Sequence, residues 1–191
     1  YADAHYNRGL ALQHLGRPAD AVASYDRALA FKPDDTEALN NRGNALLDLR
    51  RPDDALASYD RALAIRPDYA DAHANRGNAW RDLKRPEEAI ASYERALAIK
   101  SGHADALYNR GHALADVGQT GAAVASYQQA ISINPEYIEA RWSLVMAGIP
   151  RIAAANENFE VSRAAFSRGI ADLETYFDSR QLGGRDIVGI T

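Results

Sequence analysis

The sequence contains no cysteine and only one methionine. Without cysteine, the chain has no disulfide framework and no thiolate that could act as a nucleophile or bind a metal. It also lacks any run of roughly eighteen apolar residues, and its start does not have the pattern of a signal peptide. We therefore expect no membrane span, and the absence of cysteine fits a cytoplasmic protein.

Basic charge is scarce as well. The chain has 22 Lys and Arg against 26 Asp and Glu, for a formal net charge of −4. A nucleic-acid-binding protein needs a dense basic face, so this balance argues against such a partner. The five histidines are scattered without paired metal-ligand spacing, and no phosphate loop or nucleophile elbow occurs. We expect no metal, no cofactor and no catalysis by this chain.

A repeat of 34 residues dominates the sequence instead. Each unit has a glycine, an alanine, a tyrosine and a second alanine at fixed offsets, and three of the four units end in proline. These residues are Gly9, Gly43, Gly77 and Gly111, Ala21, Ala55, Ala89 and Ala123, Tyr25, Tyr59, Tyr93 and Tyr127, Ala28, Ala62, Ala96 and Ala130, and Pro33, Pro67 and Pro135. The pattern resembles the tetratricopeptide repeat (TPR) family. The resemblance covers residues 2–135.

The resemblance implies an all-α fold, a right-handed superhelical solenoid of helix–turn–helix units with capping helices at the C-terminal end. Residues 1–135 would hold four units, at approximately 2–35, 36–69, 70–103 and 104–137. We number each unit from position 1 and call its two helices A and B. In the first unit helix A should span 2–15 and helix B 18–32, since Pro18 suits a first helical turn.

The C-terminal part departs from the repeat. Residues 136–149 indicate one more A helix, but Val145 stands where the glycine is expected. A bridge at 150–157 and a capping helix at 158–182 should follow. The apolar face of the capping helix comprises Phe159, Phe166, Ile170, Leu173 and Phe177. Residues 183–191 look like the truncated start of a further segment.

The first five residues, Tyr1–His5, are identical to Tyr69–His73, which span a junction between units. We therefore interpret the chain as a fragment of a longer array. The number of repeats in the full-length protein stays open.

Position 7 of helix A holds an arginine within the apolar arc, which requires an acidic partner or a route to water. We predict that position 25 of the preceding unit supplies the carboxylate. The predicted pairs are Asp26 with Arg42, Asp60 with Arg76, and Glu94 with Arg110.

The opposite side of helix A carries polar side chains at positions 2, 6, 9 and 13. In a TPR-like stack the A helices line the concave surface, so these side chains should form a ladder along one groove. The predicted site residues are Asn7, Asn41, Asn44, Asn75, Asn78, Asn109, His112, Asp48, Asp82 and Asp116. A solvated face is the alternative, although asparagine is a mediocre helix former. The acidic residues at position 2 should add a negative rim that favours neutral or basic segments.

Three functions remain open at this stage. The first is a protein–protein interaction scaffold that binds an extended polypeptide in the groove. The acidic position 2 differs from the Lys and Arg of TPR modules that grip chaperone C-termini. The recurring asparagine at position 6 is more similar to the arm of O-linked N-acetylglucosamine transferases, including SPINDLY-like relatives. That resemblance implies a substrate-presenting arm, with the glycosyltransferase domain absent from this chain. The third function is a self-association scaffold driven by the ends of the array.

Overall fold

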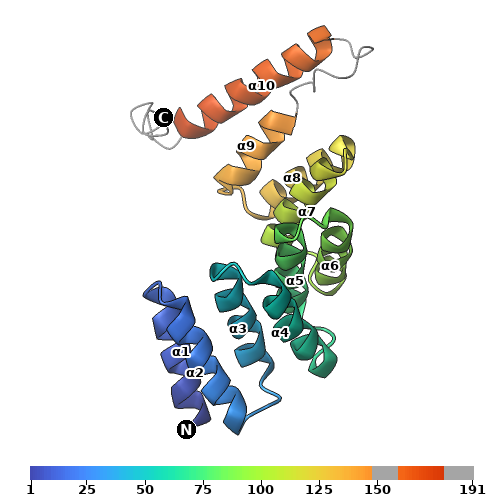
Figure 1. Cartoon of the computed structure of the whole chain (residues 1–191). Coiled ribbons are helices and arrows are strands. Elements are labelled where there is room, and N and C mark those ends of the chain that lie inside the picture. Colours follow the sequence, from blue (N-terminus) through green and yellow to red (C-terminus); the bar gives the residue numbers. More distant parts are fainter. Residues whose placement is uncertain (148–158, 179–191) are drawn as a thin grey trace.

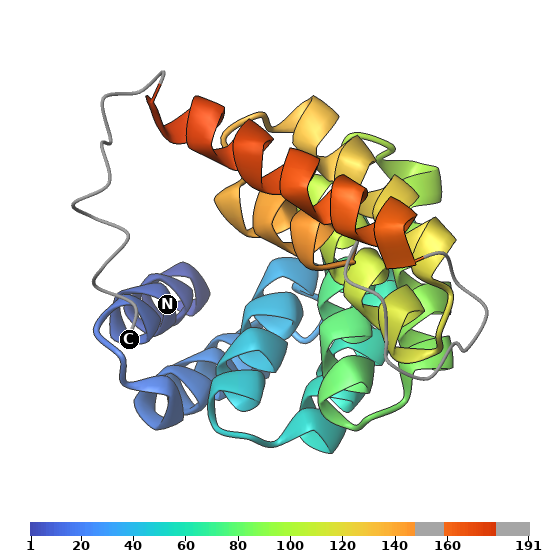
Figure 2. The same cartoon turned by 90° about the horizontal axis from the view of Figure 1, so that it is seen from above.

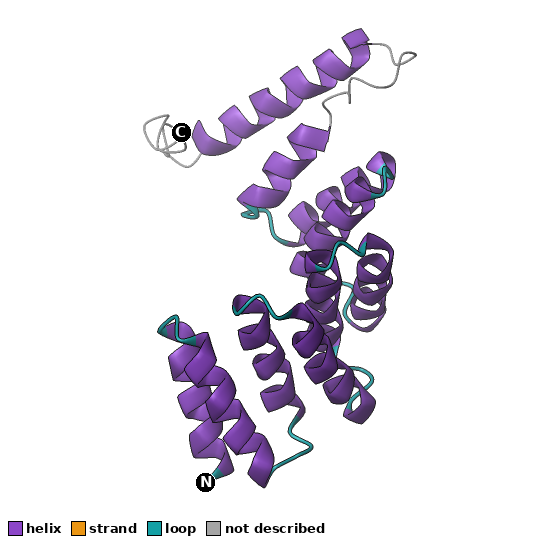
Figure 3. Ribbon diagram, in the orientation of Figure 1, coloured by secondary structure: helices purple, strands orange, loops and turns teal. Residues whose placement is uncertain are grey.

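The computed structural model describes residues 1–147 and 159–178, which form ten α-helices. This part of the chain contains no strand (Figure 3). None of its helices combines the length and hydropathy needed to cross a bilayer. The all-α prediction is confirmed.

The first eight helices form four A–B pairs that follow the 34-residue period. The A helices are α1 (Ala2–His14), α3 (Thr36–Asp48), α5 (Ala70–Asp82) and α7 (Ala104–Asp116). The B helices are α2 (Pro18–Phe31), α4 (Pro52–Ile65), α6 (Pro86–Ile99) and α8 (Thr120–Ile133). In the first unit both helices end one residue earlier than predicted. In three units proline begins helix B, where a missing N–H costs no intrahelical bond.

A tyrosine–glycine contact holds each pair together. The rings of Tyr25, Tyr59 and Tyr93 are fully buried, and Tyr127 is 2% exposed. Each ring lies against the glycine at position 8 of its own A helix. A Cβ atom on Gly77 would lie only 2.5 Å from Cε1 of Tyr93. The absence of a side chain therefore lets the two helices approach closely around a large apolar group.

The pairs stack into a curved solenoid (Figures 1 and 2). Successive A helices contact one another directly, whereas successive B helices share no comparable contact within the described residues. Close A–A packing with separated B helices places the A helices on the inner side of the curve. The A helices therefore form the inner face of the solenoid, on which the ladder is predicted to lie.

Two further helices follow the fourth pair. Helix α9 (Ile138–Ala147) continues the row of A helices, and α10 (Phe159–Asp178) packs against it. At the α9–α10 contact the large and the small residue are exchanged between the helices: α9 carries the larger residue and α10 carries the glycine. Val145 occupies the glycine position, and a Cβ atom on Gly169 of α10 would lie 2.9 Å from its Cγ2 atom. The missing glycine of the fifth unit thus has its counterpart on α10.

The apolar face of α10 turns partly inward. Leu173 is buried, while Phe166, Ile170 and Phe177 are half-buried. A cleft of about 540 Å³ lies between α8, α9 and α10, so α10 leaves part of the interface open. The side chain of Phe159, the predicted bridge at 150–157 and the segment 183–191 lie outside the described residues.

Candidate functional site

Position 6 of the inner face links each A helix to the one before it. Asn41 Nδ2 donates to the Tyr6 hydroxyl at 3.0 Å, which joins α3 to α1. Asn75 Nδ2 donates to Asn40 Oδ1 at 2.9 Å, which joins α5 to α3. The next two junctions use Arg81 Nη1 to Asn109 Oδ1 at 2.8 Å, and Ser143 with His112 at 3.4 Å. The ladder is therefore part of the stacking between A helices.

Position 9 binds the buried tyrosines. The hydroxyls of Tyr59 and Tyr93 donate to Asn44 Oδ1 and Asn78 Oδ1, both at 2.7 Å. In the first unit Leu10 stands at position 9, and the Tyr25 hydroxyl donates to Gln13 instead. Burial raises the pKa of Tyr25 to about 12, so this hydroxyl stays protonated and acts as a donor at neutral pH.

Several amide groups of the ladder have no protein partner within the described residues. The Nδ2 groups of Asn44, Asn78 and Asn109 donate no hydrogen bond there, and Asn75 Oδ1 accepts none. Asn7 on α1 is exposed and makes no hydrogen bond to a described residue. The unpaired groups of these asparagines are therefore mainly N–H donors, the groups that bind a carbonyl oxygen.

Three carboxylates accompany these amides at position 13. Asp48, Asp82 and Asp116 are the last residues of α3, α5 and α7, and all three are exposed. None forms an ion pair with another described residue. The C-terminus of a helix carries partial negative charge, so a carboxylate there is unfavourable. These acids therefore weaken their own helices and form an unneutralised negative column.

The sequence predicts that the acids at position 2 form a negative rim, but three of these acids contact other side chains of the chain. Asp3 forms an ion pair with Lys32 at 2.7 Å, and this contact lowers the pKa of Asp3. Asp71 lies 3.2 Å from His103 Nε2, and Asp105 accepts a hydrogen bond from the Tyr137 hydroxyl. His103 and Tyr137 are the last residues of the units that begin with α5 and α7, so these acids tie the start of helix A to the end of its own unit.

Two of the three predicted arginine pairs are present. Arg42 Nε lies 2.6 Å from Asp26, and Arg76 Nε lies 2.7 Å from Asp60. The Arg42 contact is a directed hydrogen bond, whereas in the Arg76 pair only the distance is satisfied, because Nε makes no hydrogen bond. Both contacts join helix A of one unit to helix B of the preceding unit.

The predicted Glu94–Arg110 pair is wrong. Arg110 donates through both Nε and Nη2 to Ser126 Oγ, at 3.2 and 2.9 Å. In Arg42 the Nε group binds Asp26 of the preceding unit. In Arg110 the same group binds the serine of its own unit. Arg8 and Arg42 also donate to this serine position, to Ser24 and Ser58.

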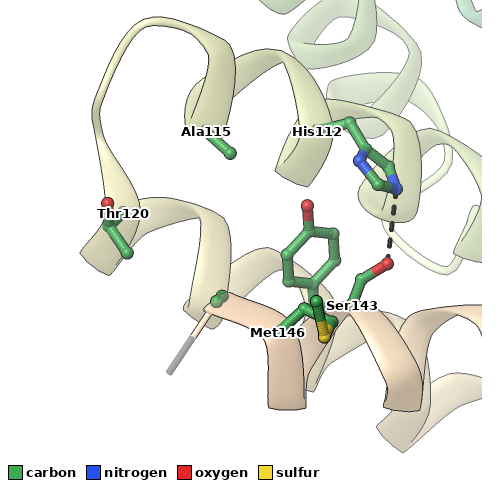
Figure 4. Close-up of a pocket in the computed structure, with 7 residues that line it drawn as sticks. His112, Ala115, Thr120, Ser143 and Met146 are labelled. Carbon is green, nitrogen blue, oxygen red and sulfur yellow. Dashed lines mark hydrogen bonds between the residues drawn. The ribbon is translucent and has the colours of Figure 1, made fainter. Parts of the chain in front are cut away.

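A pocket of about 350 Å³ opens where the ladder reaches α9. It is lined by His112, Ala115, Thr120, Tyr127, Ser143, Met146 and Ala147, and Figure 4 shows His112 bonded to Ser143 across it. Burial, followed by the nearby charge of Arg81, lowers the pKa of His112. Its imidazole is therefore neutral at physiological pH.

Sequence reasoning missed three contributors to this face. Asn40, Arg81 and Ser143 each supply one half of a junction between A helices. Asn40 stands directly beside a ladder residue, and Ser143 occupies position 6 of the fifth A helix, so both carried a signal in the repeat register. Within the described residues no group of three His, Asp or Glu side chains could hold a metal ion.

Comparisons with known proteins agree with this architecture. One model of the tetratricopeptide repeat matches residues 40–104, and a second matches residues 2–35 and 104–137. The structure of MamA from Desulfovibrio magneticus RS-1 has a TM-score of 0.75 at 21% identity, covering 89% of this chain and 93% of that chain.

Two further structures are described with peptide sites. YrrB, a TPR protein with an unusual peptide-binding site, has a TM-score of 0.70 at 20% identity, covering 90% of this chain and 86% of its own. The first TPR domain of Spaghetti (RPAP3), bound to the HSP90 peptide SRMEEVD, has a TM-score of 0.58 at 22% identity, covering 59% and 89%. At sequence identities of 20–22%, the similarity to these structures shows a shared fold and nothing further. A comparison with curated proteins gave no match.

Proposed function

Because the chain belongs to the tetratricopeptide repeat family, we propose that it is a protein-interaction scaffold that holds an extended polypeptide along its inner face. The polypeptide is neutral to basic. This chain binds it without altering it chemically.

The observation that carries the proposal is the set of unpaired amide donors on the inner face. Asn44, Asn78 and Asn109 each spend their oxygen on a protein donor and keep their N–H groups free. Main-chain carbonyls along one edge of an extended peptide accept such bonds. Recognition through the main chain leaves the sequence of the peptide largely unread, which suits a scaffold with several partners.

Charge gives the second part of the proposal. The HSP90 peptide bound by the RPAP3 domain is rich in Glu and Asp. The inner face of this chain instead carries unneutralised Asp48, Asp82 and Asp116. An acidic peptide would be repelled by this column, whereas lysine and arginine side chains would be attracted to it.

Replacing the ladder tests the proposal. The probe is a synthetic peptide of alternating lysine and serine around one central leucine, and calorimetry measures its affinity. Changing Asn44, Asn78 and Asn109 together to Ala should weaken binding at least about tenfold, since each bond contributes about 0.5–1.5 kcal/mol. The same variant loses the bonds that these three side chains make within the protein, so circular dichroism must show that it is folded under the binding conditions.

Asn7→Ala provides the control that separates binding from stacking. Asn7 makes no bond to a described residue, so its replacement should not lower the melting temperature, and the higher helix propensity of alanine should raise it slightly. A weaker affinity in this variant reports a direct ligand contact. Equal affinity in both the folded triple variant and Asn7→Ala would return the ladder to a purely structural role.

Two alternatives remain as proposals. The asparagine at position 6 of all four units supports a substrate-presenting arm of a glycosyltransferase. A sugar-nucleotide-binding domain beyond Thr191 in the full-length sequence would decide for it. Self-association is supported by the aromatic stack of Tyr1, His5 and Phe31 at the first unit, in which Tyr1 and Phe31 are exposed. Light scattering over a range of concentrations would reveal it.

A further inference from the structure

The pocket between α7, α8 and α9 differs in character from the rest of the inner face. Its walls include Ala115, Met146 and Ala147, with the ring of Tyr127 behind them. Met146 is 46% exposed, and the neighbouring Trp142 is 53% exposed. Exposed large apolar groups beside a recess are a usual feature of binding sites. The polar ladder therefore ends in an apolar recess.

The recess follows from one short side chain. Position 12 carries Leu47 in the second unit and Arg81 in the third. Leu47 packs into the core cluster of its unit, and Arg81 reaches across to Asn109 on the next A helix. Position 12 of the fourth unit is Ala115, which is too short to fill the space before α9.

The fourth tyrosine also lacks the usual acceptor, because His112 stands at position 9 in place of the asparagine of the second and third units. The hydroxyls of Tyr25, Tyr59 and Tyr93 all donate to an amide oxygen of their own A helix. Tyr127 faces His112 edge-on at 5.4 Å between ring centroids and donates no hydrogen bond to a described residue. Its hydroxyl is not among the buried unpaired groups, and Tyr127 lines the pocket. The pocket thus combines apolar side chains with the Tyr127 hydroxyl and with three other polar side chains, those of His112, Thr120 and Ser143.

We propose that this pocket binds one large apolar side chain of the peptide held by the ladder, and that the peptide carries lysine or arginine beside that anchor. The proposal rests on the function proposed above and adds a sequence preference to it. Tyr127 donates to a main-chain carbonyl next to the anchor. Asp116, one residue beyond Ala115 and free of ion pairs, attracts the neighbouring cation. His112 is neutral because burial lowers its pKa, so it does not repel that cation.

The test compares two synthetic peptides of alternating lysine and serine, one centred on leucine and the other on glycine. Burying one leucine side chain is worth about a tenfold gain in affinity or more. The wild-type chain should therefore bind the leucine peptide at least about tenfold more tightly. Ala115→Leu restores the residue of the second unit and fills the recess. It should abolish this preference, so that the variant binds the two peptides with equal affinity.

Ala125→Leu is the matched control, because Ala125 is exposed on α8 and does not line the pocket. This variant should keep the full preference for leucine. Met146→Ala gives an independent test at an exposed wall residue, and it should shift the preference from leucine towards a tryptophan-centred peptide. If Ala115→Leu does not fold, the Met146→Ala result decides.

The outcomes separate the two proposals. A wild-type chain that binds both peptides equally overturns the anchor pocket and leaves the scaffold function standing. A leucine preference that survives Ala115→Leu likewise places the anchor elsewhere in the groove. Failure to bind either peptide overturns the scaffold function for basic peptides, and the anchor pocket with it.

Discussion

A single glycine position determines how closely each A helix approaches its B helix. The ring of Tyr93 occupies the space where a side chain on Gly77 would lie. The same contact recurs at the other three units, which explains why the sequence repeats both residues in register. The repeat signature is therefore a packing requirement of each unit.

Gly77→Ala should destabilise the chain. The new methyl group would meet the buried ring at 2.5 Å, and overpacking of this kind costs about 1–3 kcal/mol. The higher helix propensity of alanine offsets about 1 kcal/mol of that cost. Gly121→Ala is the control, since no atom lies within 4 Å of its added methyl group. A melting temperature that rises in both variants would contradict the packing argument.

His112 should make stability depend on pH. Burial lowers its pKa below the ordinary value of 6.5, so the unfolded chain binds the proton more tightly. Stability should therefore be unaffected well above pH 6.5 and should fall as the pH drops through the lowered pKa. Arg81 adds to this effect, while Asp116 opposes it.

The variant that tests this pH dependence is His112→Asn, which places the residue of the second and third units at this position. Its melting temperature should fall less than that of the wild type between neutral and mildly acidic pH. Parallel curves for the two proteins would show that other groups cause the acid loss.

At the scale of elements, the bounds of the helices in the first repeat could be predicted to about one residue. Proline starts three of the B helices, and the period transfers each boundary to the next unit. The position of α10 could not be predicted. Val145 showed that the tyrosine–glycine contact is absent from the fifth unit, but nothing in the sequence indicated that Gly169 supplies the small partner.

Removing α10 should expose the apolar side of α9. Deleting every residue after Pro150 should lower the melting temperature or produce oligomers, because Val145 and Leu144 lose their cover. Gly169→Leu is a gentler version, since its side chain would collide with Val145. Ala171→Leu, at an exposed position of the same helix, should change little. A clean monomer with an unchanged melting curve after the deletion would remove the capping role.

At the scale of the whole molecule, the period predicts that all ladder residues share one face, and the structure links position 6 of four A helices to the preceding A helix. The links between A helices were beyond sequence reasoning, because they depend on how one unit rotates against the next. Asn75, for example, bonds to Asn40, whereas Asn41 bonds to Tyr6. The choice of Arg110 between Glu94 and Ser126 is likewise a matter of side-chain conformation.

The carboxylates of the acidic column should lower the stability of the array and at the same time raise its affinity for a basic peptide. Changing Asp48, Asp82 and Asp116 together to Asn removes three charges from helix C-termini. Removing each charge should raise the free energy of unfolding by about 0.3–1 kcal/mol at low salt, so the melting temperature should rise. Affinity for the lysine–serine peptide should fall, and its dependence on salt should become weaker, because fewer charges attract the peptide.

Asp53→Asn is the matched control for this variant. Asp53 is exposed in the first turn of α4, where a carboxylate is favourable, and α4 is a B helix. The same change of charge should there lower stability slightly and leave peptide affinity unchanged. Thermal melts and calorimetry at two salt concentrations check both proteins. If the triple variant gained stability but bound the peptide with the same affinity and salt dependence, the acids would not contact the ligand. The preference for basic segments would then have no physical basis.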